Sequence, residues 1–109
     1  MELNEIIEIN KKFHTGTVRS KSSLDFAVSA AKHTKNWIEQ LAYLLRAIII
    51  DHPFEDGNKR TALVVLAYYF EKNNLVYNED KITRLIIKIA VENINDIKKL
   101  GREIKNVIE

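Results

Sequence analysis

The chain has 109 residues, a length typical of a single domain with one hydrophobic core, and we expect one domain over residues 1–109. Apolar residues make up 46% of the sequence and charged residues 29%, a balance that excludes a disordered or membrane-embedded chain. The net charge of +2 comes from 17 cationic and 15 anionic side chains spread along the chain, so nucleic acid is not an expected partner. Cysteine is absent, which excludes disulfides and thiolate sites.

Neither a membrane span nor a secretion signal is expected from the sequence. The purely apolar runs, such as those at residues 47–50 and 62–70, are far shorter than the roughly 20 residues that a spanning helix needs. The amino-terminal stretch MELNEIIEINKK is acidic before it is basic and contains no apolar signal core. We therefore expect a cytoplasmic protein without a membrane partner.

Apolar residues recur at helical spacing along almost the whole chain, which predicts an all-α domain. The first expected helix covers residues 3–14, and the polar segment 15–23 predicts a loop or small hairpin. A second helix follows, capped by the hydroxyl of Ser22 or Ser23 and with Asp25 in its first turn. Its expected buried stripe consists of Leu24, Ala27, Val28 and Ala31.

Two further helices are apolar on most sides, which predicts central positions in the core. The third covers residues 36–51, and the fourth runs from about Asn58 to the pair Asn73-Asn74, where asparagine tolerates the left-handed conformation that ends helices. Residues 75–77 are expected to be briefly extended. The expected caps are Asn78 or Asp80 for a fifth helix and Asn95 or Asp96 for a sixth.

The segment HPFEDGNKR, residues 52–60, joins the two central helices and carries more chemistry than a connecting loop needs. It holds the only proline of the chain, one of its three glycines, a histidine, two carboxylates and two cations. Proline after His52 favours an extended conformation of the histidine and so keeps its imidazole at the helix end. Phe54 predicts an anchor that pins the loop to the core, and Gly57 allows a turn or the close approach of a ligand.

The start of the fourth helix predicts an anion site. Its free amides and positive dipole end face the loop, and Lys59 and Arg60 in its first turn would be unfavourable without an anion beside them. A polyphosphate meets this requirement, and Asp56 is placed to hold a magnesium ion next to it. His52 is then within reach to take a proton from an incoming hydroxyl. The pattern therefore fits phosphoryl transfer, which depends mostly on positioning and on stabilisation of charge.

The stretch HPFEDGNKRTA resembles the signature of the Fic/Doc (Fido) family, His-x-Phe-x-acid-Gly-Asn-(Gly or Lys)-Arg. The residues that match its fixed positions are His52, Phe54, Asp56, Gly57, Asn58, Lys59 and Arg60. The resemblance implies a Fido-type helical bundle of about six helices, with the motif between two central helices. It also implies a short flap loop or hairpin before them, for which residues 15–23 are the candidate.

By this resemblance the protein is an ATP-dependent transferase that modifies a Ser, Thr or Tyr hydroxyl of a target protein, with ATP as co-substrate and Mg²⁺ as the metal. His52 is implied to be the general base and Asp56 the metal ligand. The implied phosphate-binding residues are Gly57, Asn58, Lys59 and Arg60. The implied target-binding flap residues are Thr17, Val18, Arg19 and Ser20, which would hold the target segment by backbone pairing.

The transferred group depends on a few positions of the motif. Residues 58–63 read Asn-Lys-Arg-Thr-Ala-Leu, as in members that resemble the Doc toxin of toxin–antitoxin pairs. In AMP-transferring members a glycine at position 59 leaves part of the anion pocket open, whereas Lys59 fills it. This favours the opposite orientation of the triphosphate, in which the γ-phosphate faces the target and phosphate is transferred. Pro53 and Gly57 are shared with the AMP-transferring members, so AMP transfer is one alternative. A Fido-fold protein that only binds its partner is the other.

The family's inhibitory helix carries the pattern Ser/Thr-x-x-x-Glu-(Gly/Asn), and this chain matches it only at Glu92-Asn93. Lys88 stands where the hydroxyl residue belongs, and Leu63 replaces the arginine that would pair with the glutamate. We therefore expect no built-in inhibitor. Restraint of an active enzyme is expected from a separate antitoxin or inhibitor protein.

Overall fold

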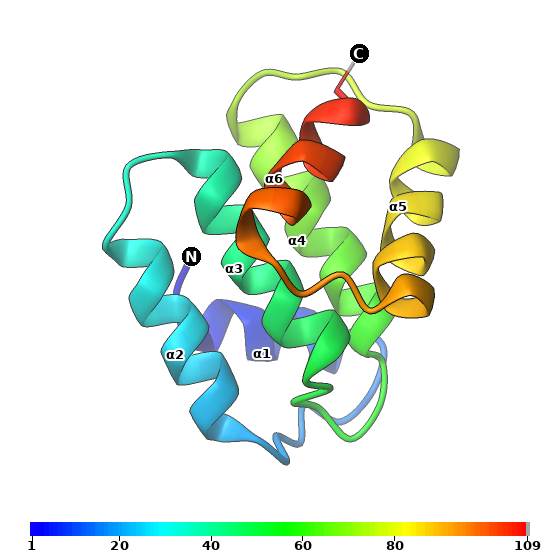
Figure 1. Cartoon of the computed structure of the whole chain (residues 1–109). Coiled ribbons are helices and arrows are strands. Elements are labelled where there is room, and N and C mark those ends of the chain that lie inside the picture. The colour runs from blue at the N-terminus through cyan, green and yellow to red at the C-terminus, as the bar shows by residue number, and fades with distance from the viewer. Residues whose placement is uncertain (109) are drawn as a thin grey trace.

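The computed structural model describes residues 1–108, which form a bundle of six α-helices (Figure 1). The helices are α1 (Leu3–Lys11), α2 (Lys21–Lys32), α3 (Trp37–Ile50), α4 (Asn58–Lys72), α5 (Glu79–Glu92) and α6 (Ile97–Asn106). Residues 1–108 contain no β-strand, only an isolated antiparallel bridge between Val18 and Phe54. The predicted all-α fold is confirmed.

The third helix lies at the centre of the bundle because its sequence is apolar on nearly all sides. It packs against α2, α4, α5 and α6, while α1 packs against α4 and α2. Its buried residues are Leu41, Ala42, Leu44, Leu45, Ala47, Ile48 and Ile49. This core holds the end of α3 and the start of α4 close together, and the loop between them is the segment 52–57 (Figure 1).

Side-chain caps mark the starts of three helices. Asn36 accepts hydrogen bonds from two backbone amides of the first turn of α3, and Asn78 and Asp96 each accept one from the first turns of α5 and α6. Each cap satisfies amides that have no partner inside the helix and typically contributes about 1 kcal/mol to helix stability. The sequence had left two candidates for each of the last two caps, and the structure selects Asn78 and Asp96.

The start of α2 differs from the prediction. The helix begins at Lys21 with Ser20 at its N-cap, so Ser22 and Ser23 lie inside the first turn, and no acidic residue lies in that turn. The predicted caps and the predicted position of Asp25 are therefore wrong. The reason is tertiary: the backbone N–H of Ser20 donates to the Pro53 carbonyl oxygen at 3.1 Å, so the chain enters the helix from a paired segment. The predicted buried stripe of α2 is confirmed.

Helix ends follow the asparagine signals. Helix α4 ends at Lys72, with Asn73 as its C-cap and Asn74 at a φ of +57°, as predicted. Residues 75–77 form no strand. Helix α1 ends at Lys11, before the predicted end at His14. Within residues 1–108, no helix is long and apolar enough to cross a membrane.

Candidate active site

The loop between α3 and α4 is fixed to the core by Phe54, whose side chain is only 1% exposed, so the predicted anchoring is confirmed. The side chain of Asn58 holds the same residue. Its Oδ1 accepts a hydrogen bond from the Phe54 backbone N–H at 3.1 Å, and its Nδ2 donates to the Phe54 carbonyl oxygen at 3.1 Å. Asn58 was predicted to bind phosphate, but its side chain is engaged by the loop, which leaves its backbone amide for a ligand.

Gly57 forms the turn at the start of α4. Its φ of +75° lies in the left-handed region that favours glycine, and a Cβ at this position would lie 3.1 Å from Asn10 Nδ2. Its backbone N–H donates to Asp56 Oδ1 at 2.7 Å. Because glycine has no side chain, the first amides of α4 receive no side-chain cap from it, unlike those of α3, α5 and α6. This helix end is therefore open to an external anion.

One pocket of about 410 Å³ brings the sequence-predicted catalytic, metal and phosphate residues together. It is lined by Phe13, His52, Asp56, Gly57, Asn58, Lys59 and Arg60. Of these, Phe13, His52, Asp56, Lys59 and Arg60 are exposed. A histidine, a carboxylate and two cations thus border the same hollow as the uncapped end of α4.

His52 departs from the predicted extended conformation. Its φ is +48°, in the left-handed region, and the preceding Asp51 is the right-handed C-cap of α3. A left-handed residue after the C-cap is a common way to end a helix, and here it outweighs the extended preference of a residue before proline. For a residue other than glycine this conformation is uncommon and costs about 1–3 kcal/mol. The imidazole still lies outside the helix, as predicted.

Asp56 suits a magnesium ion that arrives together with phosphates. One of its oxygens accepts the Gly57 N–H, and the other carries no hydrogen bond from the described residues. No cluster of three His, Asp or Glu side chains able to hold a metal occurs within residues 1–108. Magnesium bound by a single carboxylate takes its other ligands from phosphate oxygens and water, so the chemistry of this site fits Mg²⁺ with a polyphosphate.

The predicted flap residues lie directly beside the loop. Val18 forms the antiparallel bridge with Phe54, and the backbone N–H groups of Arg19 and Ser20 both donate to the Pro53 carbonyl oxygen, at 2.6 and 3.1 Å. The Glu55 N–H donates to the carbonyl oxygen of Thr17 at 3.1 Å. The flap is therefore a single segment, residues 17–20, that pairs with the loop rather than with a second strand of its own.

This pairing leaves one edge of the flap free. In this antiparallel pair the hydrogen bonds are made by the residues before and after the bridged residues. Each bridged residue then points its own N–H and C=O away from the partner segment. The N–H and C=O of Val18 therefore point away from residues 53–55. Both groups have no hydrogen-bond partner among the described residues, so they are available to pair with a second extended chain.

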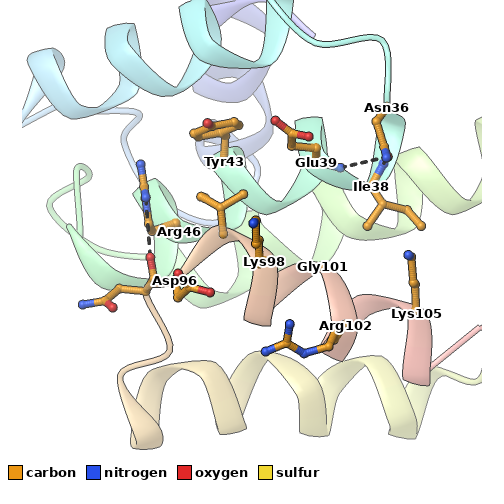
Figure 2. A pocket seen from close by; sticks show the side chains of 12 residues that line it. Asn36, Ile38, Glu39, Tyr43, Arg46, Asp96, Lys98, Gly101, Arg102 and Lys105 are labelled. Carbon is orange, nitrogen blue, oxygen red and sulfur yellow. Dashed lines mark hydrogen bonds between the residues drawn. The ribbon is translucent and has the colours of Figure 1, made fainter.

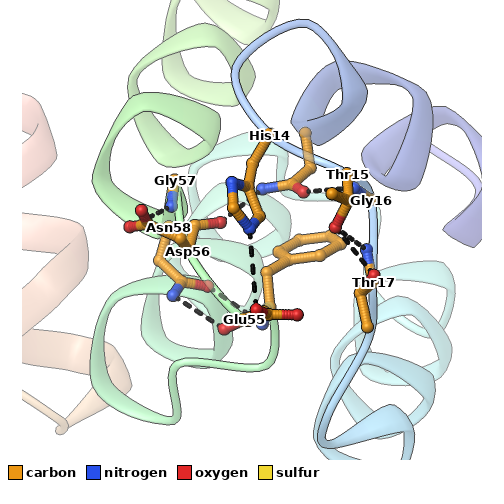
Figure 3. Close-up of polar contacts among 10 residues, drawn as sticks. His14, Thr15, Gly16, Thr17, Glu55, Asp56, Gly57 and Asn58 are labelled. Carbon is orange, nitrogen blue, oxygen red and sulfur yellow. Dashed lines mark hydrogen bonds and ion pairs between the residues drawn. The ribbon is translucent and has the colours of Figure 1, made fainter.

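Three residues at the end of α1 border the site and were missed by the sequence analysis. Asn10 is completely buried, Phe13 lines the pocket, and His14 places its Nε2 4.0 Å from Glu55 Oε1 (Figure 3). The signal for Asn10 was a polar residue four positions after Ile6, on the buried side of an amphipathic helix. Nothing comparable marks Phe13 or His14, because their role depends on the distant loop.

A second and larger pocket, of about 640 Å³, lies between α3 and α6 (Figure 2). Its cationic residues are Arg46, Lys98, Arg102 and Lys105, and its carboxylates are Glu39 and Asp96. The amide end of α6 is not open here, because Asp96 caps it. The Arg46 guanidinium is 5.4 Å from the ring centre of Tyr43. The pocket contains none of the motif residues, so we take the smaller pocket as the candidate active site.

Comparison with known families finds a match that covers most of the chain. A family model described as the Fic/DOC family matches residues 2–70, which include α1, the flap, the loop and most of α4. No curated protein matches the chain. The matched region is more than half of the chain and contains every residue that lines the smaller pocket.

Proposed function

The chain belongs to the Fic/DOC family, and from this premise we propose that it is an ATP-dependent transferase that modifies a hydroxyl group of a target protein. The observation that carries the proposal is the pocket at the start of α4. It combines a histidine, a carboxylate, a left-handed glycine turn and two cations next to uncapped helix amides. Binding a polyphosphate offsets the unfavourable cations at this helix end.

Each group of the pocket has a role in such a transfer. The first amides of α4, with Lys59 and Arg60, would bind the phosphate oxygens of ATP and stabilise negative charge as the transfer proceeds. Mg²⁺ held by Asp56 would neutralise part of the phosphate charge. His52 would take the proton of the target hydroxyl as its oxygen bonds to phosphorus and the bond to the leaving phosphate oxygen breaks. The free backbone edge of Val18 would hold the target segment.

We propose phosphate transfer as the reaction and AMP transfer as its alternative. Lys59 supports the first, because it lines the pocket at the helix start, where its side chain takes up anion space and adds a charge. Gly57 supports the second, since AMP-transferring members share this glycine. The two reactions differ in which phosphorus meets the hydroxyl, and therefore in whether ADP or pyrophosphate leaves.

We further propose that restraint comes from a separate protein, as in a toxin–antitoxin pair. The segment that partly matches the inhibitory motif lies in α5, where the Nζ of Lys88 is 3.1 Å from both carboxylate oxygens of Glu103 on α6. Leu63, at the position of the second arginine, packs against the core. Both residues have structural partners that suit a bundle better than an inhibitor.

Labelled ATP tests the proposal. The protein is incubated with a cell lysate, magnesium and ATP labelled at either the α or the γ phosphorus. The label that is transferred to protein is then measured. Label from γ supports phosphorylation, and label from α supports AMP transfer. The His52→Ala variant should lose the transfer, whereas His33→Ala, at an exposed histidine on the C-cap of α2, should keep it. If the wild type transfers neither label, the proposed enzymatic activity is contradicted and a binding role is favoured.

A further inference from the structure

Asn10 is a polar residue that is buried in the protein interior. Its exposed fraction is 0%, and Asn10 and Thr61 are the two buried polar residues among residues 1–108. Burying a side-chain amide is costly unless its hydrogen bonds are made inside the protein. Its partners therefore show what this amide holds in place.

The Asn10 side chain reaches two different segments at the site. Its Nδ2 donates to the Asp56 carbonyl oxygen at 2.9 Å and to Thr61 Oγ1 at 3.1 Å. Its Oδ1 accepts a hydrogen bond from the Gly16 backbone N–H at 3.0 Å, at the base of the flap. Gly16 and Asp56, whose backbone groups bond to this side chain, are both labelled in Figure 3.

Thr61 extends this contact to the next peptide group. Its hydroxyl accepts from Asn10 and donates to the Gly57 carbonyl oxygen at 2.8 Å. The carbonyls on both sides of the turn, those of Asp56 and Gly57, are thus held toward the protein interior. In a planar trans peptide the C=O and N–H point in opposite directions, so the N–H groups of Gly57 and Asn58 are turned away from the interior.

We propose that Asn10 is a positioning residue for the transfer reaction: through Thr61 it orients the amides of the phosphate-binding turn, and through Gly16 it fixes the base of the flap beside that turn. This inference rests on the proposed function for its effect on ATP. Its structural part, the joining of flap and turn, stands on the hydrogen bonds alone. Asn10 itself does not line the pocket, so it acts through these neighbours.

Two substitutions separate the contacts of the amide. Asn10→Asp keeps an acceptor for the Gly16 N–H and removes the donor to Asp56 and Thr61. Thr61→Val keeps the shape of the threonine and removes both hydrogen bonds of its hydroxyl, the one from Asn10 and the one to the Gly57 carbonyl, while the bond from Asn10 to Asp56 remains. Leu100→Ala is the stability control, because Leu100 is fully buried on α6, which packs against α3 and α5 and not against α1 or α4.

Two measurements follow for each folded variant. The first is hydrogen exchange of the Arg19 and Glu55 amides, which make the flap–loop hydrogen bonds and need no ligand to be observed. The second is the Kd for Mg-ATP by calorimetry. Asn10→Asp should speed exchange and weaken ATP binding by about tenfold or more beyond Leu100→Ala, the size expected when a buried hydrogen bond is lost. Thr61→Val should weaken ATP binding by several fold, a smaller loss because the bond from Asn10 to Asp56 remains.

The outcomes are distinguishable. If Asn10→Asp and Thr61→Val match Leu100→Ala in both exchange and ATP affinity, Asn10 is an ordinary buried residue and the inference is overturned. If the wild type binds no ATP, the proposed function fails, and the exchange rates alone decide whether Asn10 joins flap and turn. Should Asn10→Asp not fold, Thr61→Val decides the effect on the turn: unchanged ATP affinity in that variant overturns the inference.

Discussion

Among single residues, Gly57 has little freedom to change. Its φ of +75° strains any other residue, and a Cβ would come within 3.1 Å of Asn10 Nδ2. We predict that Gly57→Ala lowers the free energy of unfolding by at least about 1 kcal/mol and weakens Mg-ATP binding, because the turn must shift. Urea denaturation and calorimetry measure the two effects.

Gly101 provides the matched control for this substitution. It lies inside α6, its φ is not in the left-handed region, and a Cβ there would make an ordinary contact of 3.7 Å with Ile38 Cγ2. Gly101→Ala should therefore raise the free energy of unfolding by about 0.5–1 kcal/mol, because alanine is the better helix former. Equal effects of the two substitutions would contradict the role of the left-handed turn.

Lys59 is the residue on which the transferred group is expected to depend. We predict that Lys59→Gly raises the ratio of α-label to γ-label transfer, because it removes a charge and opens space in the candidate active-site pocket. Lys59→Arg keeps the charge and the bulk and should leave the ratio near that of the wild type. Double labelling of the same reaction measures the ratio, and an unchanged ratio in Lys59→Gly would show that the orientation of ATP is set elsewhere.

At the scale of elements, the flap uses its backbone on both sides. One side pairs with residues 53–55, and the other presents the N–H and C=O of Val18. We predict that Val18→Pro, which removes this N–H, lowers target modification about tenfold or more while the Kd for Mg-ATP changes little. Arg19→Ala changes a side chain of the same segment and should keep modification within about twofold of wild type, because backbone pairing needs little from side chains. A larger loss in Arg19→Ala than in Val18→Pro would reverse this assignment.

The helices were predictable where their signals are local. The caps Asn36, Asn78 and Asp96 bond to amides two or three residues away, so the sequence near each helix contains the whole interaction. The apolar stripe of α2 is equally local. The cap signals at Asn78 and Asp96 placed the starts of α5 and α6 close to their observed positions without knowledge of the fold.

Two errors came from contacts between distant segments and one from a local competition. Helix α2 starts at Lys21 because the flap pairs with Pro53. His52 is left-handed because ending α3 outweighs the local preference of a residue before proline. Asn10 was missed because its partners lie 46 and 51 residues further along the chain. The motif 52–60 identified the residues of the candidate site, but the residues that position them belong to another helix.

At the scale of the whole molecule, α4 joins the site to the core. Its first turn borders the pocket, and its buried residues Val65, Leu66, Tyr69 and Phe70 belong to the core around α3. The loop before it is likewise pinned by Phe54. The site is therefore formed by the folded core and does not require a separate ordering step for its helix.

The buried tyrosine Tyr69 is expected to make the protein less stable at alkaline pH. Burial raises the pKa of the Tyr69 hydroxyl to about 12, whereas an exposed tyrosine in the unfolded chain titrates near pH 10. Between these values the unfolded state loses its proton while the folded state keeps it, so stability is complete below about pH 10 and falls as the pH rises toward 12.

We predict that Tyr69→Phe removes this part of the alkaline loss. Urea denaturation at about pH 9 and pH 11 should show a clear fall in the free energy of unfolding for the wild type and a smaller fall for Tyr69→Phe. Tyr68→Phe, at the neighbouring and more exposed tyrosine, should keep the wild-type fall because Tyr69 is still present. The same fall in all three proteins would exclude Tyr69 as the cause.

The contact between Gly57 and Asn10 has a genetic consequence. In cells that express an unrestrained and harmful transferase, survivors would carry substitutions that inactivate the protein. Gly57 and Asn10 each admit few replacements, because a Cβ at Gly57 would crowd Asn10 at a left-handed φ and the buried Asn10 amide makes three hydrogen bonds. Inactivating substitutions should therefore gather at the end of α1 as well as in the segment 52–60, although 46 residues separate Asn10 from Asp56 along the gene product.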